Sequence, residues 1–293
     1  MKYISILLLS LCVCSCSSSK KTVTTPSKEI AKTEPVEQVV ETVIENKKVE
    51  KIVTETEIKK DTIIDTGDFH QELTKSFRNI TTHQLWDELL TENVSENGTV
   101  NYPSLMKNYG KLNAYINLLD KIKQKDLTVT KEQKLAFWIN AYNAFTVDLI
   151  LRNYPVKSIK DIKDPWKQRL WKLGDKWYNL DEIEHQILRK MDEPRIHFAI
   201  VCASYSCPKL QNTAFTAENL EAQLTNATKA FLNDPKHNQI EEAHLKLSKI
   251  FKWFAKDFKQ NGSIVSFISK YNTSKISEDA KISYKDYNWD LND

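Results

Sequence analysis

The chain has 293 residues, of which 42 are Lys or Arg and 39 are Asp or Glu, so its formal net charge is only +3. Proteins that bind nucleic acids usually carry a clear basic excess, so this balance argues against that class of partner. The five glycines leave no room for the glycine-rich loops that bind phosphate groups. The length suffices for one large domain or two small ones.

The first residues predict a lipoprotein signal peptide over 1–15. Lys2 supplies one positive charge, an apolar run follows from Tyr3 to Val13, and the small Ser15 precedes Cys16. The run is about half the roughly 20 residues that a membrane-spanning helix needs, so it is typical of a secretory leader. Cleavage before Cys16 would free that thiol for lipid, and several acyl chains anchor a protein stably. We expect an envelope protein outside the cytoplasm, on the periplasmic or outer-membrane side; an ordinary cleaved signal is the alternative.

Residues 16–67 predict a flexible tether that follows the lipidated Cys16. From Ser17 to Gly67 there is no Trp, Tyr or Phe, while Thr, Val, Glu and Lys recur. Such a segment cannot bury a hydrophobic core. A short amphipathic strand or helix is the alternative, since Val and Ile alternate locally with charged residues. The globular domain is then expected over 68–293.

The clearest element of that domain is a helix from Thr130 to about Arg152. Thr130 and Gln133 have the spacing of a capping box, and Pro155 follows the predicted end. Apolar residues recur every three or four positions along it and predict a buried stripe. The stripe consists of Leu135, Trp138, Tyr142, Phe145 and Leu149. Asn140 and Asn143 fall on a second apolar stripe, where a buried amide needs partners or costs about 1–3 kcal/mol.

The sequence of the rest of the domain predicts short helices and strands. A β-hairpin is expected over 171–180, and Asp181 with Glu184 would open a short helix to about Lys190. The run 195–203 is apolar on both faces, which favours an interior strand. Further helices are expected from Thr216, from Ser248 and over 264–271. Together these elements predict a mostly helical α+β domain with a small sheet, as a single globular unit.

Several long segments of this domain resemble the DUF547 family, whose function is unknown. They are 137–144, 154–159, 184–185, 195–210 and 286–292, and the resemblance covers about 80–292. In the closing segment, Asn288 and Asp290 stand where the family has Asp and Ser. The resemblance implies a shared fold and no particular activity.

The densest chemistry lies between Glu184 and Cys207, where two thiols and two imidazoles fall within 23 residues. One interpretation is a cysteine-dependent hydrolase or acyl transferase that acts on an envelope peptide or amide. A thiolate, from Cys202 or else Cys207, would be the nucleophile, an imidazole the base, and an amide or carboxylate its orienting group. The candidate catalytic residues are Cys202, Cys207, His185, His197, Glu184 and Asn140.

A second interpretation, which the sequence favours slightly, is a disulfide between Cys202 and Cys207. An exported protein would retain such a bridge, and it would staple the loop between the two residues. The protein would then be a binding or scaffolding module for an envelope peptide or polymer. The stretch 157–176, with seven basic and three acidic residues, could meet an anionic polymer or simply be a solvated face.

A third interpretation is a Zn²⁺ site formed by His185, His197, Cys202 and Cys207. Their spacing matches no strong zinc pattern, so we expect no metal and no cofactor. Alternatively, His197 is a satisfied core histidine and both cysteines are small apolar packing residues.

Overall fold

The computed structural model describes residues 83–121 and 130–293. The expected signal peptide, the lipid site at Cys16 and the tether over 16–67 lie outside the described residues. Within the described ranges, no helix combines the length and the apolar character needed to cross a membrane.

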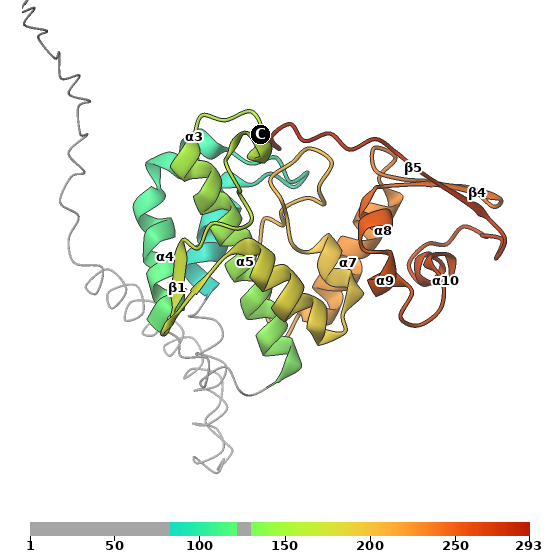
Figure 1. Ribbon diagram of the computed structural model, residues 1–293, viewed down its shortest axis with the longest axis horizontal. Helices are drawn as coiled ribbons and strands as arrows, with labels where there is room; N and C mark the ends of the chain where they lie inside the picture. The colour runs from blue at the N-terminus through green and yellow to red at the C-terminus, as the bar shows by residue number, and fades with distance from the viewer. Residues whose placement is uncertain (1–82, 122–129) are drawn as a thin grey trace, which may run out of the picture.

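The centre of the fold is helix α5 (Lys131–Asn153), which confirms the strongest prediction. Its capping box is complete, with Thr130 Oγ1 accepting from the Gln133 N–H and the Gln133 side chain accepting from the Thr130 N–H. Every residue from Leu135 to Leu151 is buried, so the helix is enclosed on all sides. A helix over 83–93, α3 (Tyr102–Lys107) and α4 (Tyr109–Lys121) cover one side of it (Figure 1).

The predicted hairpin is also confirmed. Strands β1 (Trp171–Leu173) and β2 (Lys176–Tyr178) pair antiparallel, and Gly174 makes the turn with φ +62°. Trp171 anchors the hairpin on α5, because its ring stacks on Phe145 at 4.6 Å and its indole N–H donates to buried Asp148 at 2.7 Å.

The prediction of an interior strand over 195–203 is wrong. The segment forms the 3-10 helix η5 (Pro194–Phe198) and then an irregular buried loop. Pro194 favours a helical start, and an apolar run this short fits a buried turn as well as a strand. Ile196 belongs to the hydrophobic cluster around α5, whereas Phe198 belongs to a second cluster in the C-terminal part. The segment therefore connects the two cores.

The C-terminal helices are shorter than expected. Helix α7 (Leu220–Asn233) begins four residues after Thr216, whose Oγ1 accepts from the Asn219 N–H in the preceding turn. The helix expected from Ser248 is broken at Phe254 into α8 (Ile250–Trp253) and α9 (Ala255–Phe258). Helix α10 (Ile264–Ser269) covers most of the last predicted helix.

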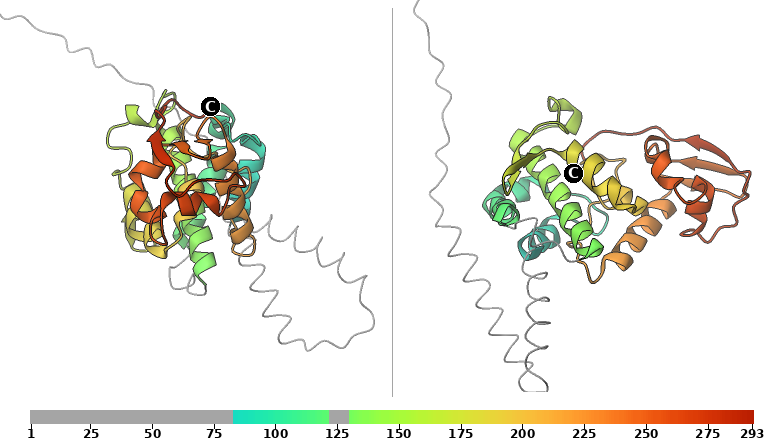
Figure 2. Two further views of the ribbon diagram at one scale, coloured as in Figure 1. Left: turned by 90° about the vertical axis from the view of Figure 1, so that its right-hand side faces the viewer. Right: turned by 60° about the horizontal axis from the view of Figure 1, so that its bottom comes forward.

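A second sheet stands at the end of the molecule far from α3 and α4 (Figure 2). Its order is β3 (Gln239–Ile240), β4 (His244–Leu247) and β5 (Lys281–Tyr284), with β3 antiparallel and β5 parallel to β4. The domain is thus mostly helical with small sheets, which confirms the predicted fold class.

After β5 the chain runs back along the molecule to end beside α3 (Figure 1). This C-terminal tail, residues 285–293, makes β-bridges at Ser158↔Asp290 and Ser204↔Leu291. The backbone N–H of Asn292 also donates to Ala203 O at 3.3 Å. The tail therefore holds the loop that contains the two cysteines against the rest of the domain.

Candidate functional site

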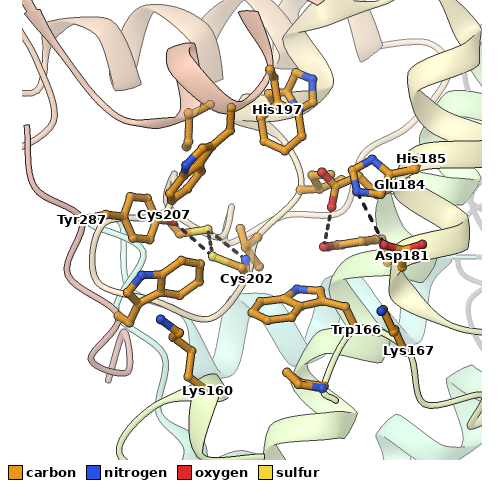
Figure 3. Close-up of a pocket in the computed structure, with 18 of the residues that line it drawn as sticks. Lys160, Trp166, Lys167, Asp181, Glu184, His185, His197, Cys202, Cys207 and Tyr287 are labelled. Carbon is orange, nitrogen blue, oxygen red and sulfur yellow. Dashed lines mark hydrogen bonds and ion pairs between the residues drawn. The ribbon is translucent and has the colours of Figure 1, made fainter. Parts of the chain in front are cut away.

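A cavity of about 650 Å³ opens where the loop 160–167, the cysteine loop, α8 and the C-terminal tail meet. Cys202, Cys207 and Tyr287 lie together on one side of it, and Glu184 and His185 lie on another (Figure 3). Much of the remaining wall is aromatic. The aromatic residues that line it are Tyr142, Trp166, Trp253, Phe254, Tyr287 and Trp289.

The two cysteines are free thiols whose sulfurs lie 2.8 Å apart. The backbone N–H of Cys202 donates to Cys207 Sγ at 2.9 Å. Cys202 Sγ also lies 3.1 Å from Ser204 Oγ and 3.2 Å from the Tyr287 hydroxyl. Cys202 is a partly exposed residue whose sulfur is thus surrounded by groups that can donate to a thiolate, while Cys207 is buried.

These contacts separate the acidities of the two thiols. Hydrogen bonding from Cys207, helped by Ser204 and Tyr287, outweighs burial and lowers the pKa of Cys202 to about 7. Burial raises the pKa of Cys207 well above its ordinary value, and a negative charge on Cys202 raises it further. Near pH 7 the Cys202 thiol is therefore about half ionised, and the Cys207 thiol is much harder to ionise.

The backbone that presents Cys202 is held in a sparsely populated conformation. Ala203 has φ +55°, in the left-handed region that costs a residue with a Cβ roughly 1–2 kcal/mol. The tail stabilises this turn, since the Tyr205 N–H donates to Asp290 O at 2.7 Å and the Ser206 N–H donates to Asn288 O at 3.1 Å. Strain of this kind, kept in place by surrounding bonds, is typical of functional loops.

Asn288 contributes to the same turn. Its Oδ1 accepts from the Asp290 N–H at 2.8 Å, and its own N–H donates to Ser206 Oγ at 2.8 Å. A carboxylate at position 288 could accept the first of these bonds equally well.

Two asparagines of α5 hold neighbouring loops by their side-chain amides. Asn143 donates to Ala199 O at 2.9 Å and accepts from the Val201 N–H at 3.0 Å, directly before Cys202. Asn140 makes the same pair of bonds with the backbone of Phe215, at 2.8 and 3.0 Å. Asn140 does not line the cavity, and both the N–H and the oxygen of its side-chain amide are bonded to the backbone of Phe215.

Glu184 lies on an irregular helical segment in the cavity wall. The helix expected from Asp181 is capped instead by Asn179, whose side chain accepts from the Glu182 N–H, and begins at Leu180. It consists of α6 (Leu180–Glu182), the π-helical turn η3 (Ile183–Ile187) and η4 (Leu188–Met191). The Glu184 carboxylate accepts from the Tyr142 hydroxyl at 3.0 Å, and burial raises its pKa.

Both histidines line the cavity, and each is engaged by residues other than the cysteines. His185 Nδ1 accepts from Arg189 at 2.9 Å. His197 is 3% exposed, stacks on Phe254 at 3.9 Å between ring centres, and pairs through Nε2 with Asp257 at 2.8 Å. Burial lowers the pKa of His197, and its hydrogen bond to Asp257 only partly opposes that shift.

Asp257 is a buried charged centre that the sequence analysis missed. Arg189 donates to both of its carboxylate oxygens, at 2.6 and 2.7 Å, and His197 contacts one of them. Burial opposes its ionisation, but the bonds from Arg189 and His197 hold its pKa well below the usual range. A polar residue between Phe254 and Phe258, in a predicted apolar helix, was the only available signal.

The cavity wall also contains a cluster of aromatic rings in mutual contact near the tail. Trp289 lies 4.6 Å from Tyr287 and 5.8 Å from Trp253, and Lys160 Nζ lies 4.8 Å above the Trp289 ring. Trp253 is 46% exposed. This aromatic wall is suited to apolar or planar groups of a ligand, with a cation at its edge.

In the part of the chain that the structure describes, no three His, Cys, Asp or Glu side chains are grouped as metal ligands would be. Comparison with known proteins gives one family. Residues 127–232 match the model described as "Protein of unknown function, DUF547", which confirms the resemblance over that range. The matched range contains α5, the hairpin, both cysteines and most of α7. No curated protein and no solved structure matches the chain.

Proposed function

We propose that the protein is a cysteine-dependent hydrolase or acyl transferase. The chain carries a domain of the DUF547 family, whose function is unknown, and the proposal rests on the site described above. The observation that carries the proposal is the position of Cys202. Its sulfur forms part of a cavity wall, has a pKa of about 7 and lies within hydrogen-bond reach of Cys207, Ser204 and Tyr287. Such an environment produces a thiolate without a neighbouring imidazole base.

The proposed reaction begins with the Cys202 thiolate attacking a carbonyl carbon of a peptide or amide. A C–S bond forms, the C–N bond breaks, and the leaving amine takes a proton. Glu184 is the proposed donor of that proton, because it lines the same cavity as Cys202 and burial raises its pKa. Water or a second amine then attacks the thioester, which releases the acyl group and restores the thiol. In this scheme His197 and Asp257 position the cavity wall, and Asn140 has no catalytic part.

An activated ester such as p-nitrophenyl acetate tests this step on the full chain. We expect a rapid release of p-nitrophenol and an acetyl group on Cys202, because thiolates form acyl intermediates readily. Cys207→Ser, which keeps a hydrogen-bond donor beside Cys202, is the matched control and should still be acylated. Cys202→Ser should lose at least about 100-fold in the initial rate. An equal rate in Cys202→Ser would end the proposal.

A second candidate is a non-catalytic binding or scaffolding module with a Cys202–Cys207 bridge. The aromatic wall formed by Tyr287, Trp253 and Trp289 favours it, because such surfaces bind ligands without chemistry. For both candidates we propose an envelope peptide, amide or polymer as ligand, and a membrane attachment through lipid on Cys16. These parts of the proposal rest on the sequence of residues 1–67.

A further inference from the structure

The two sulfurs have the geometry of a pair that can open and close. We propose that Cys202 and Cys207 are a reversible dithiol that exchanges with disulfides of small thiols or peptides. This activity goes beyond acyl transfer and does not depend on it. It also differs from a permanent staple, because it requires both states of the pair to be accessible.

Closure needs little movement of the chain. The sulfurs lie 2.8 Å apart, and a disulfide places them roughly 2.05 Å apart. The loop between them is already fixed at Ser204, Tyr205 and Ser206 by the C-terminal tail. Because only four residues separate the cysteines, closing the ring restricts the unfolded chain less than a long loop would. The bridge would accordingly add little to the stability of the fold, so it can open without the domain unfolding.

The two cysteines also differ in exposure, so that one can react first with an incoming disulfide and the other can complete the exchange. Both cysteines line the cavity, but Cys202 is partly exposed whereas Cys207 is only 7% exposed. An incoming disulfide can therefore reach Cys202 first, and Cys207 is placed to attack the product from within. The hydroxyls of Ser204 and Tyr287 next to Cys202 are able to stabilise it as the attacking thiolate.

The exchange proceeds in two balanced steps. The Cys202 thiolate attacks one sulfur of the incoming disulfide, which breaks that S–S bond and releases one thiol after protonation. Cys207 then loses its proton and attacks the sulfur of Cys202 in the mixed disulfide, which releases the second thiol. Two electrons and two protons pass from the cysteine pair to the incoming disulfide. While the bridge is closed, Cys202 cannot act as a nucleophile.

Buffers with varied ratios of reduced and oxidised glutathione test the proposal. The full chain is equilibrated, quenched in acid, alkylated and digested. The mass of the peptide 196–209, which contains both thiols and no other cysteine, is then measured by mass spectrometry. We expect a change from mainly dithiol to mainly disulfide within the range of ratios. A pair that stays closed in excess reduced glutathione, or open in excess oxidised glutathione, would overturn reversible exchange.

Two variants test the order of attack. Cys207→Ser should accumulate glutathione on Cys202, because the resolving thiol is absent. Cys202→Ser should accumulate at least tenfold less on Cys207 in the same time. Faster adduct formation on Cys207 would contradict the proposed roles. Acylation by an activated ester is read separately on the reduced protein, so failure of exchange and failure of acyl transfer give different results.

Discussion

Replacing Asn143 by alanine should lower the free energy of unfolding by about 2–5 kcal/mol. The substitution leaves the Ala199 carbonyl and the Val201 N–H buried without their partner, and each such group costs about 1–3 kcal/mol. The same change frees the backbone that precedes Cys202, so we also expect the Cys202 thiol to react more slowly with iodoacetamide at pH 7. Denaturant unfolding and alkylation kinetics measure the two effects.

Asn140→Ala is a matched control for this prediction. Asn140 makes the same two bonds from the same helix, but with Phe215, away from the cysteines. Its loss should reduce stability by a similar amount and leave the alkylation rate of Cys202 unchanged. If both variants slow alkylation equally, the effect is global, and Asn143 does not position the thiol.

Asp257→Asn should destabilise the protein by about 2–4 kcal/mol at pH 7. The amide removes the negative charge that pairs with Arg189, and it replaces with a donor one of the two oxygens that accept from Arg189 and His197. Removing one member of a buried ion pair typically costs about 3–5 kcal/mol, and the partial exposure of Arg189 reduces that figure. Glu221→Gln, at a pair whose carboxylate is exposed, is the control and should cost under about 1 kcal/mol.

The destabilisation caused by Asp257→Asn should depend on pH in a definite direction. The pKa of Asp257 in the folded protein lies below its ordinary value, so its ionisation stabilises the fold above the ordinary pKa of about 4. That contribution is lost as the pH falls further. The difference in stability between wild type and Asp257→Asn should therefore shrink from pH 7 to pH 3. A difference that is constant over this range would contradict the assigned pairing.

Local signals predicted the framework of the fold. Helix α5 was predicted in full because the capping box at Thr130 and the three- and four-residue repeat of large apolar residues agree. The hairpin was predicted because a glycine separates two short apolar runs. The run at 195–203 was misread, since an apolar pattern alone does not distinguish a strand from a buried turn.

The site was predicted only in part, because its contacts join distant segments. Cys202, Cys207, Glu184, His185 and His197 all line one cavity, as their clustering suggested. The pairing of His197 with Asp257 spans 60 residues, and the contact of Cys202 with Tyr287 spans 85. No local pattern indicates which distant residue will meet a given side chain. The role of Asn140 was misplaced for the same reason, since its partner Phe215 is 75 residues away.

The pH dependence of Cys202 alkylation tests the central claim most directly. Iodoacetamide labelling of the reduced full chain, followed residue by residue in the digested peptide, gives the pKa of each thiol. We predict a midpoint near pH 7 for Cys202 and much slower labelling of Cys207. Tyr287→Phe, which removes one donor to the Cys202 sulfur, should move the midpoint upward. A midpoint at the ordinary cysteine value of about 8.5 in the wild type would contradict an activated thiol at this site.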